Sequence, residues 1–161
     1  MSNDFLRELG HLGVTARLKR LSNSISYSIR FLYQEQGLDI EPSWHLIFLW
    51  LEEQETSTMT EIATALQYSQ AAITKILSKM KTKGYIELTM DPGDQRRKLI
   101  SLSPKAQKHL PQFKKVWAAG QRSIAEMLEG NMVFLQGLTA FEDQQQQQAF
   151  ANRALKKLSE K

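Results

Sequence analysis

The sequence predicts a mainly α-helical protein with one small β-hairpin. Two observations lead to this fold class. Apolar residues recur at helical spacing along most of the 161 residues, which predicts amphipathic helices. Two short segments that alternate apolar and polar residues flank the turn Asp91-Pro92-Gly93-Asp94, which predicts a hairpin. Because no linker separates these elements, we expect a single domain over residues 1–161.

The composition predicts a folded globular protein, since 42% of residues are hydrophobic and 24% are charged. The chain contains no cysteine, which excludes disulfides, thiol redox switching and zinc–cysteine sites. Residues Met1–Gly10 lack the apolar core of an export signal. The longest apolar run, Trp44–Leu51, is too short to span a bilayer. We therefore expect a cytoplasmic protein with no membrane partner.

The first third of the chain predicts two helices. The apolar spacing favours a long helix over residues 5–35, with Gly10 and Gly13 as points where its start breaks or bends. Gly37 is expected to end this helix. A second helix is expected over residues 41–54, because Pro42 suits a first helical turn.

The next two predicted helices are joined by about three residues. Thr58 and Glu61 have the spacing of a capping box, which predicts a short helix ending near Leu66. Ser69 begins another helix, which ends at Lys83 before Gly84. This helix has one apolar stripe, and its opposite face is polar and basic. That face consists of Ser69, Gln70, Ala71, Thr74, Lys75, Ser78 and Lys79.

The hairpin and two further helices complete the predicted order. Residues 85–90 and 98–102 are the expected strands, because the turn chemistry lies between them. Ser103-Pro104 predicts a helix that runs to about Glu129. The capping-box spacing recurs at Thr139–Glu142, which predicts the start of a last helix that ends near Leu158. We expect the glutamines at 144–148 to form an exposed face of that helix.

The net charge of +4 is localised. Residues 69–98 contain seven Lys or Arg and three acids, a difference of four, and the rest of the chain contains fourteen of each sign. A charge run is usually a solvated face. Here it coincides with the polar helix and the hairpin, and a local cationic surface is typical of proteins that bind a polyanion.

Two helices joined by a tight connection, the second polar and basic, fit the helix-turn-helix pattern. The major groove of B-DNA admits one helix. Gln70 has the paired donor and acceptor that can read an adenine edge, whereas Lys75 and Lys79 suit phosphates, which position a protein without reading sequence. At the hairpin tip, an arginine is suited to the narrow minor groove. The tip contributes Asp94, Arg96 and Arg97, and we expect Asp94 to orient the Arg96 guanidinium or a neighbouring basic side chain.

Residues 58–106 resemble the winged helix-turn-helix of MarR-family transcription regulators. Tyr68–Lys75 resembles the start of their recognition helix, and Lys83-Gly84-Tyr85-Ile86 its exit into the wing. Asp91–Arg96 is similar to the wing motif aspartate-proline-any-aspartate-any-arginine. The pattern departs from the family at Lys81, where an acid is frequent, and at Ala106, where glycine is common.

The resemblance implies a homodimer that binds a pseudo-palindromic operator in double-stranded DNA, most often as a repressor released by a ligand. The dimerisation helices are then residues 5–35 and 104–158, and the winged helix-turn-helix residues 40–103. A small aromatic or anionic effector is the ligand class implied. Its candidate pocket residues are Tyr33, Trp44, His45 and Trp117, for which core packing is the alternative role.

Other classes of function have weaker support in the sequence. A helical dimer that uses its winged domain to bind a protein is the alternative, because fold alone does not determine function. His11, His45 and His109 lack the spacing of metal ligands. We recognise no catalytic constellation or phosphate-binding glycine loop. We therefore expect no enzyme activity, no metal and no cofactor.

Overall fold

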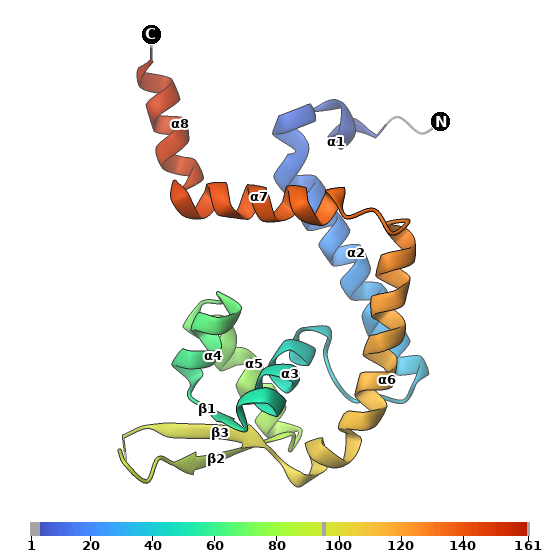
Figure 1. Ribbon diagram of the computed structural model, residues 1–161, viewed down its shortest axis with the longest axis vertical. Helices are drawn as coiled ribbons and strands as arrows, with labels where there is room; N and C mark the ends of the chain where they lie inside the picture. Colours follow the sequence, from blue (N-terminus) through green and yellow to red (C-terminus); the bar gives the residue numbers. More distant parts are fainter. Residues whose placement is uncertain (1–3, 95, 161) are drawn as a thin grey trace. The chain divides into compact units, whose positions relative to one another are not determined.

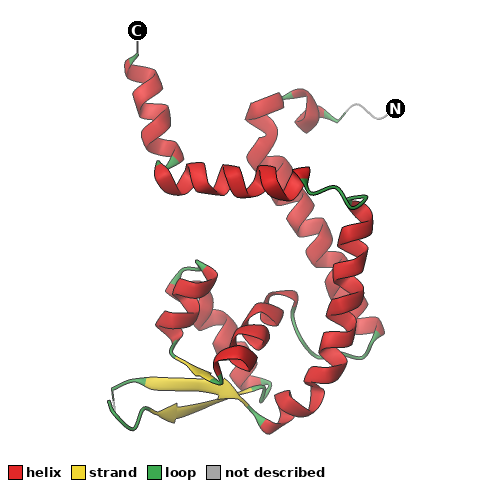
Figure 2. Cartoon of the chain, in the orientation of Figure 1, coloured by secondary structure: helices red, strands yellow, loops and turns green. Residues whose placement is uncertain are grey.

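The computed structural model describes residues 4–94 and 96–160. The chain forms two compact units with their boundary between Val116 and Trp117. Helices dominate both, and the strands lie in the first unit (Figure 2). This confirms the predicted fold class, mainly α with a small β wing.

The helix expected over residues 5–35 is broken near its start, at the glycines where the sequence predicts a break or bend. It consists of α1 (Phe5–Glu8), the 3-10 helix η1 (Gly10–Gly13) and α2 (Val14–Glu35). The break occurs at Gly10, whose φ of +53° favours glycine. A Cβ atom at Gly13 would overlap the carbonyl oxygen of Leu6. Glycine at this position therefore permits the close approach of α1.

The second predicted helix begins with a tighter turn than expected. Residues Pro42–Trp44 form the 3-10 helix η2, and α3 follows over His45–Gln54. Ile47, Phe48 and Leu51 are buried on one face of α3. This helix therefore forms the centre of the first unit's core.

The helix-turn-helix is formed by α4 (Met59–Leu66) and α5 (Gln70–Thr82). Both halves of the predicted capping box are present, because the Thr58 side chain accepts from the Glu61 amide and the Glu61 side chain accepts from the Thr58 amide. The Ser69 hydroxyl caps α5 by accepting from the amide of Ala72. These contacts satisfy amides that have no partner within the helix.

The hairpin is part of a three-stranded antiparallel sheet with the order β1-β3-β2 (Figure 1). Strands β2 (Ile86–Met90) and β3 (Lys98–Leu102) form the predicted hairpin, in which Leu88 lies opposite Ile100. Strand β1 (Thr56–Ser57) adds to the other edge of β3 and was not predicted. It anchors the wing to the residues that precede α4.

An aromatic cluster holds the helices against the sheet. The Phe48 ring lies edge-on to Tyr85 and Phe113, with ring centroids 5.6 Å and 5.3 Å apart. Phe113 belongs to α6 (Pro104–Met127), which follows β3 directly. Edge-to-face pairs add stabilisation beyond the area they bury. The cluster therefore fixes α3, β2 and the first half of α6 as one frame.

The second unit contains the end of α6 with α7 (Val133–Gln147) and α8 (Phe150–Ser159). The prediction that one last helix begins at Thr139 was wrong, because Thr139 lies inside α7. The helix begins earlier, where Asn131 Oδ1 accepts from the amide of Val133. The Arg153 guanidinium donates to the carbonyl oxygens of Gln144 and Gln148. It thereby satisfies carbonyl groups where α7 ends.

The apolar content of the helices can be compared with that of membrane spans. Within residues 4–94 and 96–160, no helix is long and apolar enough to cross a bilayer.

Candidate nucleic-acid interface

Helix α5 presents the polar face that its sequence predicts. Ile73, Leu77 and Met80 are buried beneath it, since a single apolar stripe packs against the core. The candidate contacts on the opposite face are all exposed, namely Ser69, Gln70, Ala71, Thr74, Lys75, Ser78 and Lys79.

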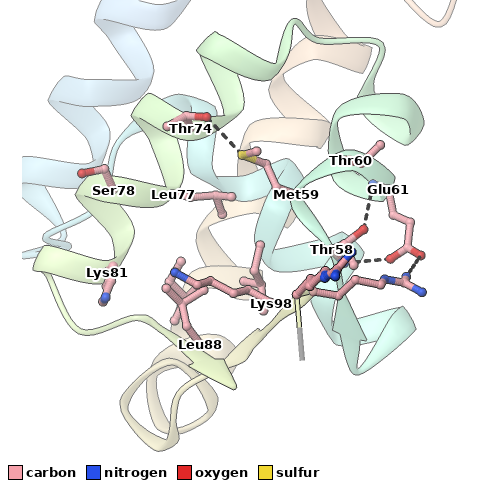
Figure 3. A pocket seen from close by; sticks show the side chains of 14 residues that line it. Thr58, Met59, Thr60, Glu61, Thr74, Leu77, Ser78, Lys81, Leu88 and Lys98 are labelled. Carbon is pink, nitrogen blue, oxygen red and sulfur yellow. Dashed lines mark hydrogen bonds and ion pairs between the residues drawn. The ribbon is translucent and has the colours of Figure 1, made fainter. Parts of the chain in front are cut away.

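The polar face of α5 borders a groove of about 810 Å³ formed with α4 and the wing (Figure 3). Thr74, Ser78 and Lys81 of α5 line one side, and Arg96, Arg97 and Lys98 line the side of the wing. Apolar residues, including Leu77, Leu88 and Ile100, lie between them. Thr74 and Ser78 of the polar face therefore border the same groove as the cationic wing, whereas Gln70, Lys75 and Lys79 are not among its lining residues.

Thr74 links the two helices of the helix-turn-helix. Its Oγ1 lies 2.8 Å from the carbonyl oxygen of Gln70 and 3.0 Å from Sδ of Met59 at the start of α4 (Figure 3). A hydroxyl that bonds to the carbonyl one turn earlier is satisfied within its own helix. Thr74 is therefore turned toward α4, and Gln70 and Lys75 remain on the exposed face.

Two aspartates shape the tip of the wing through backbone hydrogen bonds. Asp91 Oδ1 accepts from the amide of Gly93 at 2.8 Å, and Asp94 Oδ1 accepts from the amide of Arg96 at 2.9 Å. Both are Asx turns, in which a short side chain mimics a backbone turn. Asp94 therefore shapes the backbone at the tip, and the expectation that it orients a basic side chain stays a prediction. Position 95 lies outside the described residues.

The two wing arginines have different surroundings. Arg97 Nη2 lies 3.3 Å from Oε1 of Glu61 in α4, and its Nε lies 3.7 Å from Oδ2 of Asp91. In the part of the chain that is described, Arg96 has no carboxylate within ion-pair distance. Its exposed guanidinium is a wing cation available to an anionic partner.

Glu61 joins the wing to the start of α4. Its Oε2 accepts from the Thr58 amide at 2.7 Å and from the Ser57 hydroxyl at 3.3 Å. The Thr58 amide, followed by the Thr58 hydroxyl, lowers the pKa of this carboxyl, and the charge of Arg97 lowers it further. Hydrogen bonds to a carboxylate stabilise its ionised form. Sequence patterns indicated the cap but not the contact with Arg97.

A second cavity of about 440 Å³ lies between α2, the segment before η2 and α5. Tyr33 and Trp44 line it, but His45 and Trp117 are not among its lining residues. Trp44 is only 2% exposed and lies edge-on to Tyr85, so it also has the core role considered as its alternative. Sequence reasoning did not identify the ion pairs Arg30–Glu41 and Lys83–Asp39 at this cavity.

The fold and this surface together define a winged helix-turn-helix protein. Residues 38–97 match the model of the MarR family. The match covers most of the predicted winged helix-turn-helix and confirms the resemblance that the wing motif indicated.

Comparisons with individual proteins agree with this assignment. The chain is 31% identical over 84 residues to the HTH-type transcriptional regulator PapX of Escherichia coli. This match spans 52% of the chain and about half of PapX, 51%.

Solved structures share the fold over most of the chain. The transcriptional repressor CouR bound to a 23-mer DNA duplex superposes with a TM-score of 0.72 at 22% identity, covering 88% of this chain and 99% of CouR. MepR of S. aureus in complex with DNA gives a TM-score of 0.72 at 21% identity, covering 81% of this chain and 96% of MepR. At these identities the likeness shows the fold.

Proposed function

We propose that this protein is a non-enzymatic transcription regulator that binds double-stranded DNA as a homodimer. One observation carries the proposal: α5 and the wing border the same groove, with four cationic side chains and one carboxylate among its lining residues. A B-DNA phosphate backbone is attracted to such a surface. The DNA-bound states of CouR and MepR, which share the fold, support the same conclusion.

The exposed residues of α5 divide into two roles in this proposal. Gln70, with its neighbours Ser69 and Ala71, lies in the first turn and enters the major groove, where an amide side chain pairs with an adenine edge. Lys75 and Lys79 contact phosphates and position the helix. Thr74 and Ser78 line the groove beside them. Arg96 enters the adjoining minor groove.

The apolar surfaces of the C-terminal helices support the homodimer. Over the described ranges 133–147 and 150–159, no side chain of α7 or α8 is buried. Phe141, Phe150 and Leu158 are 53%, 75% and 81% exposed. Large exposed apolar surfaces mark association sites, and a second copy covers them in this proposal. A two-fold dimer then binds a pseudo-palindromic operator with half-sites about one helical turn apart.

Repression that is relieved by a ligand completes the proposal. The cavity lined by Tyr33 and Trp44 also contacts Lys79 and Lys83 of the α5 region. A small aromatic or anionic effector held there changes the position of α5 through these lining residues. The ligand shifts the equilibrium away from the DNA-bound form if it binds the free form better.

Binding to duplex DNA is expected to weaken steeply as salt rises. Lys and Arg that contact phosphates release counterions, so log K falls linearly with log salt. Fluorescence anisotropy with labelled duplexes, selected from a random library at low salt, measures both the slope and the site. A flat salt response with tight binding to a protein would favour the alternative of a protein-binding domain. Absence of duplex binding at low salt would overturn the proposal.

Gln70→Ala is expected to relax sequence preference more than it lowers affinity for random DNA. The substitution removes a base-reading amide but no charge, so the phosphate contacts remain. Library selection repeated with the variant measures the change at each operator position. The matched control is Lys75→Ala, which should weaken binding to all sequences alike. An unchanged preference for Gln70→Ala would exclude it as a base reader.

A further inference from the structure

The contacts of Arg97 differ from those expected of a DNA-contacting arginine. The sequence pattern assigns Arg97 to the DNA surface beside Arg96, yet its guanidinium lies between two carboxylates, Glu61 of α4 and Asp91 of the wing. About half of its side chain is exposed, 49%. If Arg97 left these partners for a phosphate, two carboxylates would lie unpaired next to a polyanion. The repulsion between these like charges is unfavourable by Coulomb's law.

The chain of contacts continues from Glu61 into the core of the winged domain. Glu61 Oε2 accepts from the Ser57 hydroxyl at 3.3 Å, and Ser57 Oγ accepts from Trp50 Nε1 at 3.1 Å. Ser57 lies in β1 and is 3% exposed. Glu61 is therefore held on the helix side by hydrogen bonds to residues that are themselves fixed, and Arg97 is its partner on the wing.

We infer that Arg97 is a positioning residue, which Glu61 holds so that the wing keeps the orientation in which Arg96 meets DNA. The inference rests on the proposed function and assigns a specific task within it. A wing that adopts the competent orientation only part of the time binds with an affinity reduced by that fraction. The acidic side chain in this cationic groove then increases DNA affinity, although its charge alone would oppose it.

The inference is tested by whether DNA affinity falls or rises when the charge of Glu61 is removed. Glu61→Gln keeps the capping-box geometry, because glutamine also serves at this position, but removes the charge opposite Arg97. We expect about two- to fivefold weaker operator binding, the size typical of an exposed ion pair. Glu87→Gln is the matched control, since Glu87 is an exposed acid on β2 with no ion pair recorded among the described residues. It should bind as tightly as the unchanged protein or more tightly. Equal or tighter binding by Glu61→Gln would overturn the inference.

The slope of log K against log salt distinguishes a positioning role of Arg97 from a direct phosphate contact. Arg97→Gln is expected to weaken binding by a similar factor with an unchanged slope, because no phosphate contact is lost. A direct contact would instead reduce the slope by about 0.9, which would also overturn the inference.

A measurement without DNA distinguishes failure of the inference from failure of the proposed function. The chain has no cysteine, so Gly93→Cys provides a single site for a spin label at the wing tip. Electron paramagnetic resonance should show a more mobile label when Glu61→Gln or Arg97→Gln is added, but not with Glu87→Gln. If the unchanged protein binds no duplex, the proposed function fails, and the label still reports whether Glu61 and Arg97 hold the wing. Unchanged mobility in both variants would show that they do not.

Discussion

Arg96→Ala is expected to weaken operator binding by about 1–3 kcal/mol, or about five- to 150-fold. The guanidinium lies at the end of the wing turn, where the Arg96 amide donates to Asp94. In the described part of the chain, no carboxylate lies within ion-pair distance of this guanidinium, which is therefore available to a phosphate. An arginine in a narrow minor groove is favoured by the negative potential there. Anisotropy titration at one fixed salt concentration measures the loss.

A matched variant controls for the change in net charge. Arg122 is an exposed arginine of α6, outside the winged helix-turn-helix. Arg122→Ala removes the same charge and should change affinity by less than about twofold, since Arg122 is not among the proposed DNA contacts and an exposed charge without a direct contact is screened by salt. Equal losses in the two variants would mean that the wing makes no specific contact.

Phe48→Ala is expected to lower the free energy of unfolding by about 3–5 kcal/mol. The ring is 0% exposed and lies edge-on to both Tyr85 and Phe113. Truncation loses the transfer free energy of the ring and leaves a cavity among three elements that cannot all collapse into it. Urea unfolding monitored by circular dichroism, at fixed protein concentration, measures the difference.

The neighbouring Leu49 on the same helix provides the comparison. Its side chain is 41% exposed, so Leu49→Ala should cost less than about 1 kcal/mol. If both variants lost similar stability, Phe48 would not be the centre of the core that positions the wing.

Local signals made the helix-turn-helix predictable. The capping box at Thr58 and Glu61 and the single stripe of α5 depend on residues within one or two turns of each other. The same spacing at Thr139 and Glu142 was misleading, because a cap forms only where the preceding chain leaves the helix. That condition is met eight residues earlier in the chain, where the Asn131 side chain accepts from the amide of Val133. Spacing alone cannot distinguish these two cases.

Contacts between distant residues could not be predicted from the pattern. Strand β1 is two residues long and exists because it pairs with β3, so it has no periodicity of its own. Glu61 and Arg97 are 36 positions apart, and neither residue type indicates its partner. The Asx turn at Asp94 could have been predicted, however, since a short carboxylate two residues before an amide favours such a turn.

The exposure of α7 and α8 affects how the folded fraction of the protein depends on its concentration. Since α7 and α8 bury no side chain within their described ranges, little hydrophobic stabilisation within the chain favours their order. In the proposed homodimer, a second copy covers them and so stabilises the folded form by mass action. The cellular concentration of the protein then sets the folded fraction as well as the occupancy of DNA. In this proposal, the response of DNA occupancy to a falling protein concentration is therefore steeper than simple binding would give.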